Sequence, residues 1–232
     1  EYVRYISGTF RPLFAHMLYM KGVLEFGKNT SKKMDYLYAV FQACIQLNPE
    51  LLGAAFFGGV VLPQKPADFP KGIALLKEAM QLNPGEWRIP YWIGFDYSQL
   101  EDFKNAADFY KQASLFPGSP TYLKTNLAML YYKAQSPELA ILYFRGLKDT
   151  ITDESTLELI QSKIDWLNNI IFLQQKVSEF KKLFGNWPTS LNELVDRGML
   201  LEIPKDPFGD GYYLEHSDEA GSEKCLVRSK FN

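Results

Sequence analysis

The sequence predicts a mainly α-helical fold, in which helical hairpins repeat along a solenoid and a long capping helix precedes a small β-hairpin-like tail. One observation is a period of 34 residues that relates Trp87–Pro120 to Thr121–Glu154 without a gap. Another is a pair of near-copies, Cys44–Pro49 and Ala79–Pro84, that both end in Asn-Pro. The third is a proline-free amphipathic stretch, Thr156–Phe184. A fixed period in this range indicates a solenoid, and proline ends each repeat helix because it cannot continue one.

Composition limits the partners of the chain. Its 232 residues allow one large domain or a repeat array with an appendage. The net charge of −2 and the lack of a lysine or arginine run argue against a nucleic-acid partner. Aromatic residues are in excess, with 17 Phe, 14 Tyr and 4 Trp, and most are expected in the core. The longest apolar stretch, Leu51–Leu62, is too short to span a bilayer.

Residues 1–52 are predicted to be N-terminal helices that form a cap or a degenerate repeat. Tyr5–Phe26 has the pattern of a helical pair or a cap over the first repeat. Tyr36–Pro49 has the amphipathic pattern of a second repeat helix that ends at Asn-Pro. The chain starts at Glu1 without a methionine, so a signal peptide or membrane anchor upstream of Glu1 stays an open expectation.

Residues 53–154 are predicted to hold repeat units of two helices each. In the Gly53–Glu86 unit the second helix, with Gly72, fits the pattern, whereas the first helix departs from it at Gly59 and Pro63. A loop with three prolines, Leu62–Pro70, separates these two helices. In the later units, small residues are expected to let helices approach, and aromatic residues to fill the space between units. The small residues are Gly94, Ala106, Ala128 and Ala140, and the aromatic ones are Tyr97, Tyr110, Tyr131 and Phe144.

Residues 155–184 are predicted to form one long helix that caps the solenoid. Thr152 or Asp153 is the expected N-cap, because a side-chain oxygen there accepts from the first free backbone amides. Apolar residues then recur from Leu157 to Phe184 at spacings of three and four or their sums.

Residues 185–232 are predicted to be a tail with one short helix and two short strands. The helix is expected at Leu191–Asp196, with Ser190 as N-cap and Gly198 as the residue that ends it. The strands are expected at Tyr212–Glu215 and Lys224–Arg228.

The repeat units resemble the tetratricopeptide repeat. The resemblance is carried by Trp92–Tyr97, Ala106, Tyr110, Ala113 and Pro117. It is good for two units over residues 87–154, fair for residues 53–86 and weak before them. It implies that the first helix of each unit lines a concave face, with its second, fifth, ninth and twelfth residues pointing into that face.

The resemblance therefore implies a binding groove. Its residues are Ala54, Phe57, Val61 and Gln64, then Arg88, Tyr91, Phe95 and Ser98, then Tyr122, Thr125, Met129 and Tyr132. This surface is aromatic and apolar, unlike the Lys/Asn-rich clamps of chaperone-binding members, and it suits an amphipathic helix or apolar peptide. The predicted partner-binding residues are Phe57, Arg88, Tyr91, Phe95, Tyr122, Met129 and Tyr132. The alternative is that the chain's own N-terminal helices or tail fill the groove.

The tail resembles the soluble part of the major pseudopilin of type II secretion systems over Phe180–Tyr213. The shared features are a long helix, then Gly185–Thr189 before a short helix, then Pro204–Gly209 and an aromatic strand. Pseudopilins carry an apolar membrane helix where this chain has repeats. We therefore interpret the segment as a structural tail, and its resemblance favours a bacterial cell-envelope setting, periplasmic or membrane-anchored, over the cytoplasm.

Two motifs suggest ligand binding, but each has a stronger structural interpretation. Gly22–Asn29 is close to a phosphate-binding loop, but Asn29 replaces the Ser/Thr that holds magnesium and no strand precedes it. We expect a helix end at Gly27 instead. Acidic residues in the tail offer oxygens for calcium, although an EF-hand is excluded. These residues are Asp206, Asp210, Glu215 and Asp218. We expect turns there, with Phe208 packed onto the long helix.

The remaining reactive residues form no catalytic pattern. His16 lies among apolar residues and is expected to be a core histidine, whereas His216 is expected to be exposed. Cys44 is expected to be a buried thiol, with pairing to Cys225 as the lesser alternative. No Cys/His cluster has zinc spacing, and no nucleophile has a nearby base. We therefore predict no metal, no cofactor and no enzyme activity.

The leading functional hypothesis is a non-catalytic scaffold that holds a protein partner in the aromatic groove, as part of a bacterial secretion, pilus or other envelope assembly. The alternative is a structural accessory subunit of a larger complex, with the solenoid as a spacer. An enzyme is the third class, for which the sequence offers no residue set.

Overall fold

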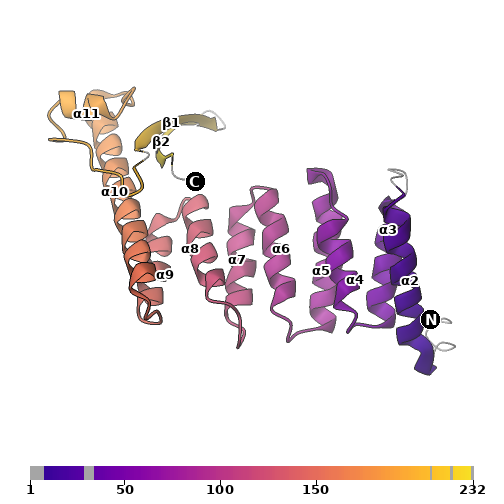
Figure 1. Cartoon of the computed structure of the whole chain (residues 1–232). Coiled ribbons are helices and arrows are strands. Elements are labelled where there is room, and N and C mark those ends of the chain that lie inside the picture. Colours follow the sequence, from indigo (N-terminus) through magenta and orange to yellow (C-terminus); the bar gives the residue numbers. More distant parts are fainter. Residues whose placement is uncertain (1–7, 29–33, 210, 220–221, 231–232) are drawn as a thin grey trace. The chain divides into compact units, whose positions relative to one another are not determined.

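The structure is a computed structural model that describes residues 8–28, 34–209, 211–219 and 222–230. Over these residues the protein is mainly α-helical, with one two-stranded antiparallel sheet near the C-terminus (Figure 1). The chain divides into two compact units, unit 1 (Glu1–Ala134) and unit 2 (Gln135–Asn232). The division falls inside the Thr121–Glu154 repeat, whose first helix belongs to unit 1 and whose second helix belongs to unit 2.

Unit 1 consists of helices that pack against their neighbours in sequence order (Figure 1). Its elements are η1 (Gly8–Phe10), α2 (Arg11–Phe26), α3 (Met34–Leu47), α4 (Leu52–Phe56), η3 (Phe57–Val61), η4 (Pro66–Asp68), α5 (Phe69–Leu82), α6 (Arg88–Gln99), α7 (Phe103–Ser114) and α8 (Tyr122–Lys133). The predicted helical pair over Tyr5–Phe26 is one α-helix after a 3-10 turn within the described residues, and residues 5–7 lie outside them. The predicted helix end at Gly27 is confirmed, because Phe26 is the last residue of α2.

The Asn-Pro corners end their helices as predicted. Helix α3 ends at Leu47, just before Asn48-Pro49, and α5 ends at Leu82, just before Asn83-Pro84. The Asn83 side-chain amide donates to the Ala79 carbonyl at 3.0 Å and to the Pro49 carbonyl at 3.1 Å. The side-chain amide therefore joins the two corners, and at Ala79 it adds a second donor to a carbonyl that already accepts from the Asn83 backbone amide at 3.0 Å.

Glycines set how closely the helices of unit 1 approach. A Cβ on Gly72 would lie 2.6 Å from the Gly59 carbonyl oxygen, and a Cβ on Gly59 would lie 2.3 Å from Leu76 Cγ. Gly59 lies in η3, which is a π-helical turn. The first helix of this unit departs from the repeat pattern at Gly59, and the structure shows that the backbone is π-helical at this point. A Cβ on Gly94 would lie 2.4 Å from a Tyr110 ring carbon, which confirms that Gly94 must be small.

Unit 2 is organised around one long helix, α10. Its elements are α9 (Pro137–Lys148), α10 (Glu154–Phe184), α11 (Asn192–Asp196), β1 (Tyr212–Glu219) and β2 (Ser222–Ser229). Asp153 caps α10 as predicted, since its carboxylate accepts from the Thr156 amide at 2.8 Å. The Thr156 and Ser155 hydroxyls also donate to this carboxylate, and together with the Thr156 amide they hold the pKa of Asp153 below its usual range. At the other end, Gly185 adopts the left-handed conformation, with φ of 79°.

The tail folds back onto α10 through specific side chains. Phe208 packs edge-on against Trp166 with ring centroids 6.2 Å apart, which confirms the predicted contact. Gln174 of α10 holds β2 at two points: its amide donates to the Cys225 carbonyl at 2.9 Å, and its carbonyl accepts from the Val227 amide at 2.8 Å. Both strands are longer than predicted. Their pairing runs from Tyr212 opposite Ser229 as far as Glu219 opposite Ser222.

The cap of α11 differs from the prediction. Gly198 ends this segment with a positive φ of 72°, as expected. Ser190 makes no side-chain cap, however. The Glu193 carboxylate instead accepts from the Thr189 amide at 2.9 Å. The prediction of a Ser190 cap was wrong, because the helix begins later, with Leu191 as its N-cap residue, and the side-chain bond at this end comes from Glu193 to an amide before the helix.

Candidate functional site

The predicted groove residues on α6 and α8 meet through a cluster of three tyrosines. Tyr91 of α6 lies 5.2 Å from Tyr110 of α7 and 6.4 Å from Tyr122 of α8, measured between ring centroids. Tyr110 is buried, whereas Tyr122 is half exposed. We call these three residues the tyrosine cluster; it joins three successive helices and presents one ring to solvent.

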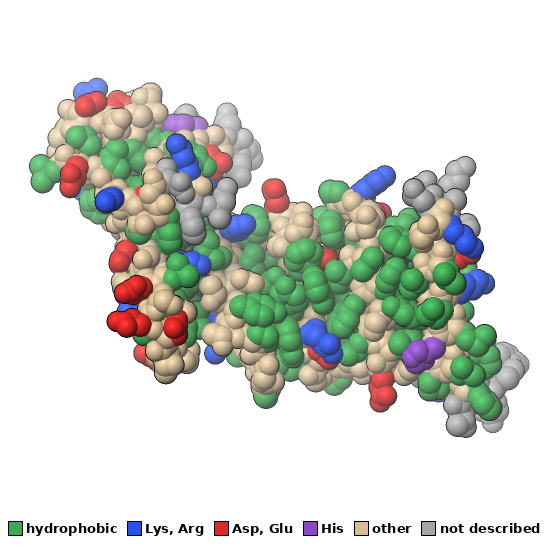
Figure 2. Space-filling model, viewed as in Figure 1, with side chains coloured by type: hydrophobic (Ala, Val, Ile, Leu, Met, Phe, Trp, Pro, Cys, Tyr) green, Lys and Arg blue, Asp and Glu red, His purple; other side chains and the backbone are tan. Residues whose placement is uncertain are grey.

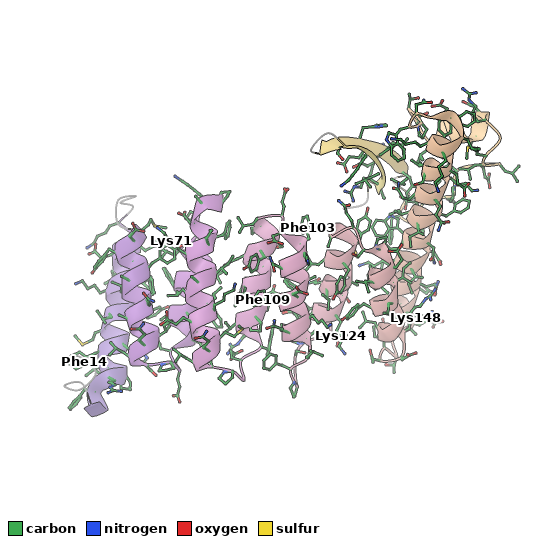
Figure 3. All side chains as sticks on the ribbon, turned by 180° about the vertical axis from the view of Figure 1, so that it is seen from behind. Phe14, Lys71, Phe103, Phe109, Lys124 and Lys148 are labelled. Carbon is green, nitrogen blue, oxygen red and sulfur yellow. The ribbon has the colours of Figure 1, made fainter. Side chains whose placement is uncertain are left out.

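Next to the tyrosine cluster, the surface is hollowed between the same three helices. The α6–α8 hollow has a volume of about 260 Å³ and is open to solvent. It is lined by Ser98, Gln99, Phe103, Tyr110, Asn126, Met129, Leu130 and Lys133. Tyr110 belongs to both features, so the aromatic cluster continues into the wall of the hollow. Figure 3 labels Phe103 on α7, one of the lining residues.

Polar groups in the wall of the hollow are few and mixed in kind. Gln99 and Asn126 supply side-chain amides, which both donate and accept hydrogen bonds. Lys133 supplies a positive charge, and its Nζ lies 5.7 Å from the centre of the Phe103 ring. Burial is the main cause that raises the pKa of Tyr110 above its usual value, so this phenol stays neutral. The hollow therefore combines aromatic walls, two amides and one cation.

The structure places other predicted groove residues in different surroundings. Phe57 packs among the rings of α2 and α3, with centroids 5.4 Å from Phe26 and 5.0 Å from Phe41. Arg88 binds the carboxylate of Glu86 at 2.6 Å, which lowers the pKa of Glu86.

Further groove residues also have varied settings. Phe95 lies 5.5 Å from Trp92, between ring centroids, and both Phe95 and Tyr132 are half-buried. Ala54 is fully buried in the core. Val61 and Gln64 are exposed, and Thr125 is half-buried.

Several residues of the hollow were not among the predicted groove residues. Tyr110 was expected to fill space between units, and Phe103, Asn126 and Lys133 were not singled out. The sequence contained a signal for this wall of the hollow, because Phe103 and Tyr110 are seven residues apart and so share one face of α7. The repeat pattern predicts binding residues on the first helix of each unit, whereas α7, a second helix, contributes the central wall of the hollow.

The histidines and cysteines are spread over both units. His16 is exposed, and its Nδ1 lies 2.7 Å from the Pro12 carbonyl oxygen. The prediction of a core histidine was wrong, because α2 turns an apolar face that includes the neighbours of His16 toward solvent. His216 is exposed as predicted. Cys44 and Cys225 are both buried thiols, and burial raises the pKa of Cys44 to about 11.

The tail acids considered as calcium ligands have protein partners where they are described. The Asp206 carboxylate accepts from the Phe208 amide and the Ser229 hydroxyl, and Glu215 accepts from Arg228. Asp210 and the Asp218 side chain lie outside what the structure describes, as does Asn29 of the loop-like motif. Across the part of the chain that the structure describes, no group of three or more His, Cys, Asp or Glu side chains is arranged to hold a metal ion.

Within the described residues, no helix combines the length and apolar character needed to cross a bilayer. No protein-family model matches this chain, and no curated protein matches it.

Proposed function

We propose that this chain is a non-catalytic protein-binding scaffold with a solenoid of the tetratricopeptide type, and that the α6–α8 hollow receives an amphipathic helix or apolar peptide. The observation that carries this function is the convergence of the tyrosine cluster and the hollow on three successive helices of unit 1. Exposed aromatic rings beside a concave surface are a common feature of peptide-binding grooves.

The chemistry of the hollow defines the ligand. Tyr122 and Met129 offer apolar and aromatic surface for a leucine-like or aromatic anchor. Gln99 and Asn126 can bond the peptide backbone, which has one donor and one acceptor at each residue. Lys133 favours an acidic residue next to the anchor of the bound peptide, since its ammonium is the only ionised group among the residues that line the hollow.

The setting in this proposal is a bacterial secretion, pilus or other envelope assembly. It follows from the resemblance of the tail to the major pseudopilin. In unit 2 the residues of the resemblance make contacts that hold the tail to α10, including the Phe208–Trp166 ring contact and the hydrogen bonds to Asp206. A tail held in this way serves as a compact cap or a second contact surface, with no polymerisation required.

The test is selection of peptides from a random library displayed on phage, with the full chain immobilised, followed by fluorescence anisotropy of an enriched peptide. Tyr122→Ala removes the half-exposed ring, and Asn126→Trp fills the hollow from an exposed position. Each variant is expected to weaken binding by roughly tenfold or more. Tyr213→Ala, at an exposed tyrosine of unit 2, is the matched control and is expected to bind as the wild type does.

An enriched peptide that binds both variants with unchanged affinity would show that the hollow is not the binding site. A selection that enriches no peptide would favour the alternative role, in which the solenoid is a spacer in a larger complex.

A further inference from the structure

Helix α2 presents a broad apolar face to solvent at one end of unit 1. Six large side chains on it or next to it are exposed, with Leu24 at 64% and Met17 at 60%. The six are Phe10, Leu13, Phe14, Met17, Met20 and Leu24. Figure 3 labels Phe14 on α2, and Figure 2 shows hydrophobic side chains together with a few basic ones over this end of the unit.

The opposite face of α2 is already used for packing within unit 1. Ala15 and Gly22 are buried, and a Cβ on Gly22 would touch the Phe41 ring at 3.0 Å. Leu18, Tyr19 and Val23 pack against the hydrophobic core. The helix is therefore apolar on both sides, and one of the two sides has no cover among the described residues.

Lysines lie on the exposed face itself. Lys21 follows Met17 by four residues, a spacing that places both on the same side of α2, and Lys28 lies just beyond the end of the helix. A shallow depression of about 470 Å³ joins them, lined by His16, Met17, Met20, Lys21, Leu24, Glu25 and Lys28. Glu25 is the acidic member, and Lys28 already binds its carboxylate at 2.7 Å. The exposed face is thus apolar with a net positive charge.

The sequence around α2 has the same charge bias. Residues 1–33 contain six lysines and arginines and two glutamates, a net charge of +4, whereas the remaining residues carry −6, because the whole chain carries −2. Basic residues that flank an apolar helical face are typical of helices that lie in the headgroup region of a bilayer with negatively charged lipids.

We propose that α2 docks its exposed face on a membrane surface that contains anionic phospholipids, and lies in the plane of that surface without crossing it. Met17, Met20 and Leu24 enter the boundary between headgroups and acyl chains. Lys21 extends its ammonium to lipid phosphates, as long basic side chains do at membrane interfaces. The length of α2, 16 residues, fits an interfacial position.

Charge decides between this occupant and a second copy of the chain. Two α2 faces brought together would bury Lys21 of each copy beside apolar side chains and another positive face. Lysine is depleted in the core of protein interfaces, and like charges there oppose association. An anionic bilayer supplies negative charge at the depth that the lysines reach.

The test is flotation of the full chain with vesicles of phosphatidylcholine alone or with about 30% phosphatidylglycerol. The wild type is expected to float with the anionic vesicles and much less with the neutral ones, and salt is expected to reduce flotation. Met17→Glu and Lys21→Glu are each expected to lower the fraction bound by roughly tenfold. Leu142→Glu, at an exposed leucine of α9, is the matched control and is expected to float as the wild type does.

Circular dichroism of each variant checks that the helices stay folded, which is expected because both sites are exposed. Equal flotation with neutral vesicles, or none with anionic ones, would overturn the proposal. A dimer in sedimentation that Met17→Glu disperses, without flotation of the wild type, would assign the face to a second copy. Peptide binding by the α6–α8 hollow is measured separately, so either result stands without the other.

Discussion

Asp96 in unit 1 and Asp206 in unit 2 are both buried, and they differ in their partners. Both carboxylate oxygens of Asp96 lack a hydrogen-bond partner among the described residues. Asp206 accepts from the Phe208 amide at 2.9 Å and from the Ser229 hydroxyl at 3.1 Å. Burial raises the pKa of the Asp96 carboxyl to about 8, because an ionised group without partners is costly away from water.

The two aspartates reflect two ways of building a unit. Unit 1 is held by shape: Gly59 and Gly72 let helices approach closely, and aromatic rings fill the spaces between them. Unit 2 holds its tail with directed bonds from α10, above all those of Gln174. A unit held by close packing can bury a carboxyl group that is neutral, whereas a tail held by hydrogen bonds loses stability when any one of the bonding partners is removed.

The largest expected effect is that Asp96→Asn stabilises unit 1 above neutral pH. The unfolded carboxyl ionises near pH 4, and the folded carboxyl stays protonated up to about pH 8. The folded state therefore binds an extra proton in this window, and its stability falls as the pH rises from 4 to 8. The asparagine variant is free of this loss, so it should gain about 3 kcal/mol relative to the wild type between pH 5 and 7.5.

Urea denaturation at several pH values measures this difference, and Asp108→Asn, at an exposed position of α7, is the control. A gap between Asp96→Asn and the wild type that stays constant across the pH range would show that Asp96 is not protonated in the fold.

A glycine of unit 1 provides the second prediction. Gly72→Ala should destabilise unit 1 by about 2–3 kcal/mol, because the new Cβ meets the Gly59 carbonyl oxygen and the Pro63 ring, which cannot move independently. Gly146→Ala in α9 is the matched control: nothing lies near its Cβ, and helix propensity should stabilise it by about 0.5–1 kcal/mol. Thermal denaturation of both variants measures whether each substitution lowers or raises stability. A stabilised Gly72→Ala would mean that α5 and η3 can move apart freely.

For the tail, Gln174→Ala should cost about 2 kcal/mol, because the Cys225 carbonyl and the Val227 amide both lose their side-chain partner. Amide hydrogen exchange should rise in β2 and stay unchanged in α6. Gln175→Ala, at the exposed neighbour on α10, is the control. If exchange in β2 is the same in both variants, the bonds of Gln174 do not hold the strand.

The smallest expected effect is that of Asp206→Asn, which should destabilise unit 2 by about 1 kcal/mol. An amide keeps one acceptor oxygen and so serves one of the two donors that Asp206 now binds. Replacement by asparagine is thus expected to raise stability at Asp96 and to lower it at Asp206. Denaturation followed by amide exchange of the 204–209 segment measures it, and a stabilising result would remove the contrast between the units.

Local signals predicted the helix ends well. Asn48-Pro49 and Asn83-Pro84 end α3 and α5, and Asp153 and Gly185 bound α10. Each depends on chemistry within one turn of the helix, which the sequence displays directly. The candidate site was predicted only in part: Ser98 and Met129 line the hollow and Tyr91 meets Tyr122, whereas Phe57 packs among the rings of α2 and α3.

The sequence by itself determined where α3, α5 and α10 end, which residues must be small, and that the tail differs from the repeats, because proline, glycine and capping side chains act on their own backbone neighbourhood. Only the tertiary structure decided which face of α2 is exposed, that η3 is π-helical where it packs on α5, and that Asp96 is buried with no hydrogen-bond partner among the described residues. These features depend on residues far apart in the chain, whose packing leaves no periodic trace in the sequence.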